Sequence, residues 1–322
     1  MQAILAVTIP FFALVLCGYL AARQRVLPES AIPGLNAFVL YFALPCLLFR
    51  FGLNTPLAQL LNPVVLAVYL SSAMLIVAGT IALTLSAAVP MKDAAFGALV
   101  AAFPNTGFMG VPLLAALLGA AAAGPVLASL LADLFITSSL CIALAQLHDA
   151  RGGGARAAAL KALRATLSNP LPWAIALGAA ARTAGLDFSG PPEVVVRMLA
   201  DAASPVALFT IGAVLWRAGQ HAHTRTPPAR YLPLAAIKLF VHPLLVFALC
   251  TAARWLGAPL SAFDTTVLTL AAALPSASNV SLLAERYGAD NGRIARIILA
   301  STALSFVSFS LLAWAFGVVV AA

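Results

Sequence analysis

Two stretches decide the fold of this chain: Phe103-Pro104-Asn105-Thr106-Gly107-Phe108-Met109-Gly110-Val111-Pro112 and Leu274-Pro275-Ser276-Ala277-Ser278-Asn279-Val280-Ser281. Each places proline and small polar residues near the middle of a long apolar segment. Proline removes one N–H donor and clashes with the preceding helical turn, so neither segment is expected to form an unbroken helix. Interrupted backbone deep in hydrocarbon is costly unless it lines a cavity, so a matched pair in the two halves of the chain indicates a binding site.

The composition places the chain in a membrane. Of its 322 residues, 63% are hydrophobic and only 9% are charged, with a mean hydropathy of +1.03. A soluble domain carries about 25% charged residues. The basic residues are scattered between apolar runs, so the predicted surroundings are a lipid bilayer and no nucleic acid. No Lys or Arg precedes the first apolar run, which favours a retained first span over a cleaved signal peptide.

Apolar length and the positions of Gly, Pro and charged residues predict ten membrane-spanning helices. They cover residues 3–22, 34–51, 63–89, 93–118, 124–147, 168–184, 194–216, 231–254, 262–286 and 292–320. The longest polar stretch divides them five and five. We therefore expect an all-α membrane protein with a first five-helix repeat at 1–147, a linker at 148–166 and a second five-helix repeat at 167–322.

The basic residues also predict the orientation. If the N-terminus is outside, the inner loops hold thirteen Lys and Arg residues, and the outer loop ends hold three, Arg50, Arg182 and Arg254. Such an excess is typical of cytoplasmic loops. We predict a multi-pass protein of the cell (inner) membrane with both termini outside and the 148–166 linker in the cytoplasm.

An odd number of spans in each half would insert two homologous halves with opposite orientation. Leu44-Pro45-Cys46-Leu47-Leu48-Phe49 echoes Ser204-Pro205-Val206-Ala207-Leu208-Phe209, and Ile9-Pro10-Phe11 echoes Leu171-Pro172-Trp173. These echoes fall in the order that an inverted five-span repeat requires. The broken helices, spans four and nine, would then cross, and their second halves would begin near Gly107 and Ser278 with their N-termini converging.

The N–H groups at such half-helix ends carry partial positive charge and suit an anion. Polar side chains on both stretches add neutral donors. The predicted substrate-binding residues are Pro104, Asn105, Thr106, Gly107, Pro275, Ser276, Ser278 and Asn279. The alternative is a pair of kinked spans whose Ser, Thr and Asn side chains only repair the backbone.

Four ionisable residues, Asp133, Asp201, Lys238 and His242, lie several residues inside apolar runs. Charges in such positions usually face a cavity or one another. Lys238 and His242 are four residues apart and share a helix face. The sequence leaves two roles open for these residues, proton coupling or a structural ion bridge.

No enzyme signature is present. The chain lacks Gly-x-Ser-x-Gly, His-Glu-x-x-His and a Walker loop. We therefore expect no catalytic residue, no metal site, no cofactor and no direct use of ATP.

At several of these residues the chain resembles the auxin efflux carrier family, which includes the plant PIN-formed proteins and bacterial carriers. The residues that carry the resemblance are 104–106 with 109–114 in span four, 34–39 with 44–45 in span two, 201–202 with 209–212 in span seven, and 274–275 with 284–287 in span nine. The short linker resembles the bacterial branch, for which malonate and similar acids are proposed substrates. Pro-Ser-Ala-Ser-Asn replaces the plant Pro-Gln-Gly pattern in span nine, which argues against the plant hormone as substrate.

This resemblance implies ten helices in two inverted repeats, divided into a scaffold and a crossover transport domain that moves in an elevator-like step. It implies organic-anion substrates, often carboxylates, and Asn105 matches the family's substrate-contacting asparagine. By analogy of fold, spans one, two, six and seven would form the scaffold and the surface of a homodimer.

The expected function is therefore secondary active transport of small organic anions. A sodium-coupled organic-anion symporter of the bile-acid type is the nearest alternative, because Asn105, Thr106, Ser276, Asn279 and freed carbonyls could bind sodium. A membrane sensor or a channel is a more distant one. Coupling to protons or to sodium is left open.

Overall fold

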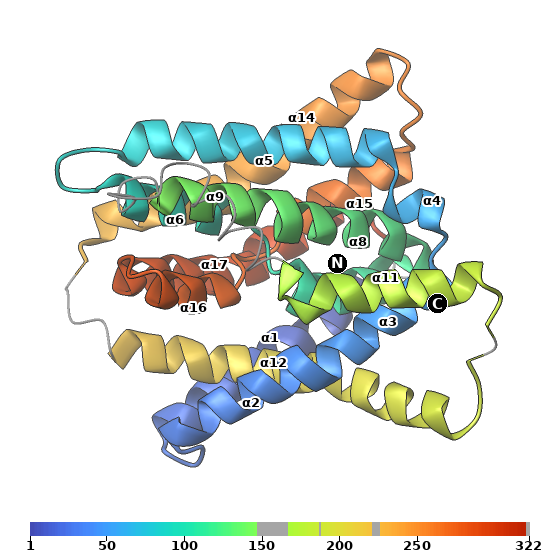
Figure 1. The fold of residues 1–322 in the computed structure, drawn as a ribbon. Helices are drawn as coiled ribbons and strands as arrows, with labels where there is room; N and C mark the ends of the chain where they lie inside the picture. Colours follow the sequence, from blue (N-terminus) through green and yellow to red (C-terminus); the bar gives the residue numbers. More distant parts are fainter. Residues whose placement is uncertain (147–166, 187, 221–225, 320–322) are drawn as a thin grey trace.

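A computed structural model describes residues 1–146, 167–186, 188–220 and 226–319, and every regular element in these ranges is a helix. The predicted linker at 148–166 lies outside them. The structure confirms the all-helical class expected from the sequence. Figure 1 shows the helices lying roughly along one direction.

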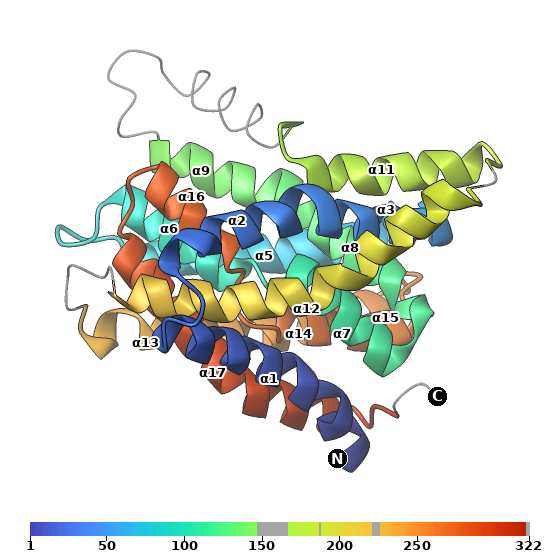
Figure 2. The same ribbon diagram turned by 90° about the horizontal axis from the view of Figure 1, so that it is seen from below.

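The first half contains the following elements: α1 (Gln2–Arg23), η1 (Glu29–Ala31), α2 (Ile32–Phe38), η2 (Val39–Ala43), α3 (Leu44–Asn54), α4 (Leu57–Leu60), α5 (Pro63–Thr84), α6 (Met91–Ala102), η3 (Thr106–Gly110), α7 (Val111–Leu118), η4 (Ala120–Ala122), α8 (Ala123–Ala132), η5 (Asp133–Thr137) and α9 (Ser138–Gln146). The described part of the second half contains α11 (Pro170–Thr183), α12 (Pro191–Gln220), η6 (Pro228–Arg230), α13 (Leu232–Ala236), η7 (Ile237–Val241), α14 (His242–Trp255), α15 (Ala262–Ala272), α16 (Asn279–Arg286) and α17 (Asn291–Ala315). The beginning of α1 and the end of α17 lie at the same end of the molecule (Figure 2).

Seven helical segments among the described residues are long and apolar enough to cross a membrane. They are Gln2–Arg23, Glu29–Asn54, Leu57–Thr84, Ala120–Gln146, Pro191–Arg217, Leu232–Trp255 and Asn291–Ala315. Three of the ten predicted spans are not continuous helices of this length. Two are the interrupted pairs α6/α7 and α15/α16, and the third is α11, whose 14 residues extend about 21 Å.

Some boundaries differ from those expected. The span predicted at 63–89 ends at Thr84, because the main chains of Ser86 and Val89 pair in a tight turn with N···O distances of 3.1 Å. The last span ends at Ala315 and not at residue 320.

Four π-turns, η2, η3, η5 and η7, widen the helices locally. In three of them a proline follows two residues after the turn ends, at Pro45, Pro112 and Pro243. Proline cannot donate to the carbonyl four residues earlier and its ring crowds that carbonyl, so a widened turn accommodates it. These turns were not predicted from the sequence, although X-Pro within an apolar run was their visible sign.

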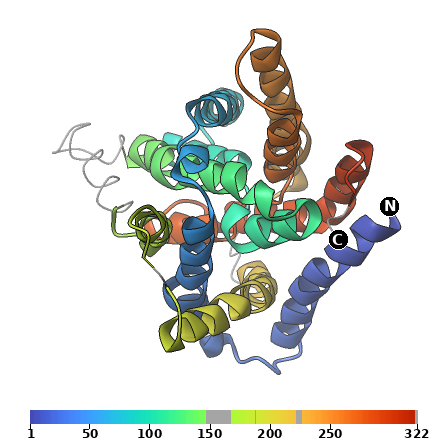
Figure 3. The same ribbon diagram turned by 90° about the vertical axis from the view of Figure 1, so that its right-hand side faces the viewer.

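The helices form two bodies, seen end-on in Figure 3. In the first, α1 packs on α12, α3 packs on α11, and α12 also packs on α3. The second contains α5, α6, α8, α9, α14, α15, α16 and α17 around the two interruptions. We call these the outer body and the crossing body.

Two pairs of glycines allow the helices of the outer body to touch along their backbones. A Cβ atom on Gly212 would lie 1.9 Å from the carbonyl oxygen of Val15, and one on Gly18 would lie 1.8 Å from that of Phe209. The contact between α3 and α11 repeats this arrangement: a Cβ atom on Gly52 would overlap the carbonyl oxygen of Ile175, and one on Gly178 would overlap that of Phe49. Only glycine fits at such contacts, because any side chain would overlap main-chain atoms.

Corresponding glycines in the two helix contacts also lie at the same sequence spacing from a proline. Gly52 and Gly212 each follow a proline, Pro45 and Pro205, by seven residues. Gly18 follows Pro10 by eight residues, and Gly178 follows Pro170 by the same number. The contacts therefore align Pro10 with Pro170, two residues away from the alignment with Pro172 that the sequence echo suggested.

We predict that Gly212→Ala destabilises the α1–α12 crossing by about 1–3 kcal/mol, the usual cost of overpacking. Thermal unfolding of the purified protein in detergent would show a lower melting temperature. Gly79→Ala is the matched control, because a Cβ there meets nothing within 4 Å. Equal melting temperatures for the two variants would contradict the close approach.

Candidate functional site: the crossing of two interrupted helices

The two interruptions meet in the interior and pair as extended chain. The N–H of Asn105 donates to the carbonyl of Pro275 at 2.8 Å, and the N–H of Ala277 donates to the carbonyl of Phe103 at 3.0 Å. Pro104 and Ser276 stand opposite each other between these bonds. In this antiparallel pairing, the residues at positions 104 and 276 donate no main-chain hydrogen bond to the opposite segment. Proline has no N–H group, so Pro104 fits there without the loss of a hydrogen bond.

The second half of each interrupted helix begins at this crossing. The first-turn helical residues are Thr106 in η3 and Asn279 in α16, each one residue from the expected positions Gly107 and Ser278. Figure 2 shows α7 and α16 running from the crossing toward opposite ends of the molecule. Their positive N-terminal ends therefore converge at one point.

Several main-chain donors remain at these helix starts. The N–H groups of Gly107 and Phe108, and those of Ser278 and Asn279, donate no hydrogen bond to another described residue. Each N–H is a donor that needs a partner when it is buried. They form a small group of main-chain donors facing the crossing.

Polar side chains at the crossing are buried and partly unpartnered. Asn105 is 3% exposed and Ser276 is fully buried. Within the described residues, no partner is found for Asn105 Oδ1, Ser276 Oγ or Asn279 Oδ1, and each of these atoms is inaccessible to solvent. Leaving a buried polar atom unpaired costs about 1–3 kcal/mol, so three at one point indicate a place for a ligand.

Thr106 behaves differently from these three residues. Its hydroxyl donates to the carbonyl of Pro104 at 3.4 Å, which is the backbone repair that the alternative reading of the sequence describes. Backbone repair therefore explains the position of the Thr106 hydroxyl. It does not explain the unpartnered side-chain atoms of the crossing.

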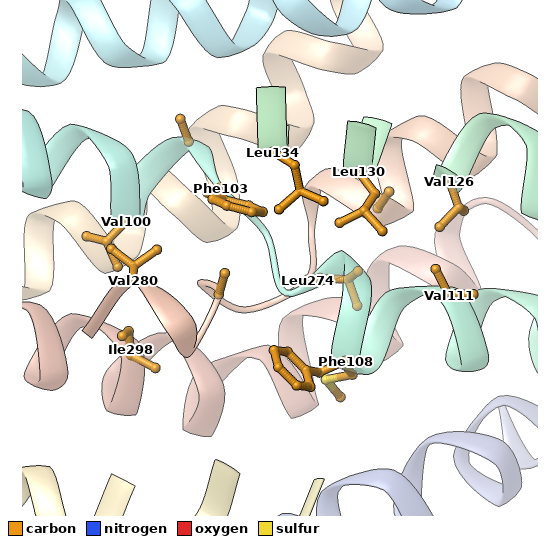
Figure 4. Close-up of a cluster of buried hydrophobic side chains, with 14 of the residues drawn as sticks. Val100, Phe103, Phe108, Val111, Val126, Leu130, Leu134, Leu274, Val280 and Ile298 are labelled. Carbon is orange, nitrogen blue, oxygen red and sulfur yellow. The ribbon is translucent and has the colours of Figure 1, made fainter. Parts of the chain in front are cut away.

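Apolar side chains surround the crossing, as Figure 4 shows. Leu130 and Leu134 reach toward it from α8 and η5, and Leu274 lies beside it. Few polar groups compete there, and electrostatic interactions are stronger than in water.

α17 supports the crossing through one serine. Ser301 Oγ accepts the N–H of Ser276 at 3.2 Å and donates to the carbonyl of Ile298 at 3.0 Å. The sequence analysis missed Ser301, because a serine within an apolar span gives no indication of which neighbour it meets.

A cavity of about 300 Å³ leads to the crossing from the end at which α16 terminates. Phe103 and Asn279 lie at its inner part, and Ser168, Asn169 and Arg286 also line it. The structure thus gives the crossing an approach from this end, while residues 101–111 on the other interrupted helix are all buried.

A second polar group lies in the same body. Asp133 accepts hydrogen bonds from the hydroxyls of Tyr69 at 2.6 Å and Thr137 at 3.0 Å. Lys238 Nζ lies 3.2 Å from His242 Nδ1, and the Tyr69 and His242 ring centroids are 6.1 Å apart. All five side chains are fully buried. We call these five residues the buried cluster.

The buried cluster contacts the crossing through Lys238, whose ammonium group donates to the carbonyl of Ala272 at 2.6 Å. Ala272 is the last residue of α15, just before the interruption. A cation at a helix C-terminus pairs with its partial negative charge. Lys238 therefore stabilises the end of the interrupted helix. His242 Nε2 has no partner among the described residues.

Asp201 lies elsewhere. Its carboxylate forms an ion pair with Arg50 at 3.2 Å between α12 and α3, and its side chain is 69% exposed. Of the four ionisable residues singled out in the sequence, the structure brings Asp133, Lys238 and His242 together and leaves Asp201 on the outer body. Tyr69 and Thr137 were missed, although a tyrosine within the apolar span 63–89 was a usable sign.

An all-helical body with seven long apolar segments among its described residues is that of a multi-pass membrane protein. Comparison with known families agrees: the profile of the membrane transport protein family matches residues 3–153 and 154–313. The chain belongs to this family, that of the auxin efflux carriers.

Its relatives are transporters by name and similar in length. A Rhizobium meliloti protein named "Putative malonate transporter" is 29% identical over 95% of this chain and 93% of its own. The uncharacterized transporter YfdV of Escherichia coli is 23% identical over 93% of each chain. An uncharacterized transporter of Methanothermobacter thermautotrophicus is 26% identical over 92% of this chain and 93% of its own.

We predict that Ser301→Ala loosens the crossing, because it leaves the buried N–H of Ser276 without its acceptor at a cost of about 1–3 kcal/mol. The matched control is Ser305→Ala, one turn further along α17, since that buried hydroxyl donates only within its own helix, to Thr302 at 2.9 Å. Thermal unfolding should show the larger loss for Ser301→Ala. A larger loss for Ser305→Ala would refute the supporting role of Ser301.

Proposed function

We propose that this protein is a secondary active transporter that moves small organic anions, carboxylates such as malonate or auxin-like acids, by elevator-type alternating access. The observation that carries this proposal is the group of main-chain donors at the crossing, the N–H groups of Gly107, Phe108, Ser278 and Asn279, which donate to no other described residue. They lie at two converging helix N-termini, next to a cavity that leads to one end of the molecule.

The charge of the crossing favours an anion that must later be released. Main-chain N–H groups and the positive ends of η3 and α16 attract negative charge. No Lys or Arg is among the residues predicted to bind substrate. A neutral site binds a carboxylate less tightly than an arginine clamp would, and turnover requires release. The name of the Rhizobium relative supports a small dicarboxylate as substrate.

The architecture proposed is ten spans in two inverted five-helix repeats. The support comes from the glycine contacts: the α1–α12 crossing and the α3–α11 crossing have the same construction and the same spacing to a proline. If span one is placed on span six and span two on span seven, the contact between α1 and α12 is placed on the contact between α11 and α3. Inverted repeats supply the two exchangeable conformations that alternating access requires.

In this proposal the outer body is the scaffold and the crossing body moves. The cavity lies between η2, which packs on α3 and α12 of the outer body, and α9 and α16 of the crossing body, so a shift between the bodies would close it. The outer body would also provide the surface of a homodimer. The proposed orientation, with both termini outside and the 148–166 linker cytoplasmic, rests on the excess of basic residues in the inner loops.

The buried cluster is the proposed site of proton coupling. Asp133, Lys238 and His242 are ionisable groups in an apolar interior, and Lys238 touches the interrupted helix directly. A change in the protonation of this group would alter the cation at the end of α15 and thereby the crossing. Asp201, exposed beside Arg50, keeps a structural role on the outer body.

A sodium-coupled organic-anion symporter is the second candidate, and one observation favours it. The unpartnered atoms at the crossing are oxygens, two amide oxygens and one hydroxyl. Hard cations prefer oxygen ligands, and unwound helices in transporters bind Na⁺ through such groups and freed carbonyls.

We predict that malonate raises the melting temperature of the purified protein, since a ligand that binds the native state stabilises it by mass action. Asn105→Ala should weaken apparent binding about tenfold, which corresponds to about 1.4 kcal/mol. Asn54→Ala is the control, because Asn54 is exposed on α3. An unchanged affinity in Asn105→Ala would show that the site is wrongly assigned. Repeating the titration with potassium in place of sodium at fixed pH separates the two candidates, because only the symporter should lose the shift.

We predict that Asp133→Asn abolishes accumulation of the carboxylate driven by a proton gradient in proteoliposomes and leaves exchange of labelled for unlabelled substrate in place. Loss of the carboxylate removes the proton acceptor of the buried cluster but not the binding site at the crossing. Asp201→Asn serves as the control and should still accumulate substrate. Gradient-driven accumulation by Asp133→Asn would exclude the proposed coupling site.

A further inference from the structure

Among the described residues that line the cavity leading to the crossing, Arg286 is the one cation. Its described lining is mainly apolar, and its polar members are Tyr41, Ser138, Ser168, Asn169, Asn279 and Arg286. None of the described lining residues is acidic. A cavity of one sign with apolar walls concentrates ions of the opposite sign. The arginine therefore makes this approach selective for anions.

Arg286 and the crossing are the two ends of one short helix. Asn279 is the first residue of α16 and Arg286 is the last. Seven residues separate them, a distance of about 10 Å along the helix axis. Both line the same cavity, and side chains on a helix lean toward its N-terminus, which here is the crossing. The two groups can therefore contact opposite ends of one small molecule.

The guanidinium group of Arg286 is available for such a contact. The side chain is exposed, and no carboxylate of a described residue lies within 4 Å of it. Its Cζ atom lies 5.9 Å from the centre of the Tyr287 ring. A solvated arginine binds a carboxylate weakly, which suits a contact that must break in each transport cycle.

The other interrupted helix has no such residue. α7, Val-Pro-Leu-Leu-Ala-Ala-Leu-Leu, carries no charge at all. Of the two second half-helices, α16 therefore carries a cation and α7 does not, and α16 is the one that lines the cavity.

We propose that Arg286 binds the second carboxylate of a dianionic substrate while the crossing holds the first, so that the protein selects short dicarboxylates over monocarboxylates. This inference rests on the proposed function and adds the residue that sets the preferred substrate charge. The crossing supplies neutral donors for one carboxylate, and Arg286 supplies charge for the other. A monoanion makes only the first contact.

The test compares malonate with its monomethyl ester, which keeps one carboxylate and nearly the same shape. In proteoliposomes at pH 7.5, the half-saturation constant for malonate and the inhibition constant of the ester are measured for the wild type, Arg286→Gln, Arg286→Lys and Arg230→Gln. The wild type should prefer malonate about tenfold, and Arg286→Gln should bind both equally with little change in maximal rate. Arg286→Lys should keep part of the preference because it keeps the charge. Arg230→Gln should behave as wild type, since Arg230 lines a different cavity.

Two results would overturn the inference while the proposed function stands. Either the wild type transports malonate and does not distinguish the ester, or Arg286→Gln keeps the full preference. A wild type that neither transports nor binds either compound would overturn the proposed function and the inference with it. A loss of affinity for both compounds by the same factor in Arg286→Gln would mark a general effect on the cavity and would also refute selection by charge.

Discussion

Two main-chain hydrogen bonds, from Asn105 to Pro275 and from Ala277 to Phe103, hold the centre of the molecule together. Non-helical backbone in an apolar interior needs partners for its N–H and C=O groups, and each interruption supplies them for the other. Because Pro104 and Pro275 prevent either helix from continuing, this pairing supplies partners that a continuous helix would otherwise provide. The convergence of the half-helices, the buried site and the cavity all depend on this short antiparallel contact.

The need to pair buried backbone groups also explains which polar groups have no partner. Near the interruptions, Ser301 satisfies the N–H of Ser276, and Lys238 satisfies the carbonyl of Ala272. The backbone around the crossing is thus supported from two neighbouring helices, α17 and the α13–α14 segment. The unpartnered atoms are instead side-chain oxygens and the first N–H groups of the half-helices. If these side chains served only to repair the backbone, their oxygens would be paired with main-chain N–H groups and would not be left without partners.

The sequence was informative where the chemistry is local. Pro104 and Pro275 marked the interruptions, because proline acts on its own turn, and the half-helix starts expected near Gly107 and Ser278 lie one residue from those observed. The sequence was uninformative where the packing of distant segments determines the position of a side chain. Asp133 and Asp201 look alike in the sequence, since both lie within apolar runs, yet one is fully buried and the other pairs with Arg50 at the surface. The roles of Ser301 and Arg286 likewise depend on which helices become neighbours, which no single segment records.

The distribution of polar contacts bears on how the two bodies could move. Inside the crossing body, hydrogen bonds across long sequence separations join η7 to α15, the interruption at Ser276 to α17, and α5 to η5. Between the bodies, a groove bounded by α1, α12 and α17 is lined almost entirely by apolar side chains. The hydroxyls of Thr8 and Ser310 form a weak link there at 3.4 Å. Hydrophobic contact is non-directional, so a body whose hydrogen bonds are internal can shift against an apolar partner without breaking them. The main-chain pair at the crossing would travel intact in such a shift, and the groups proposed to bind substrate would keep their geometry on both sides of the membrane.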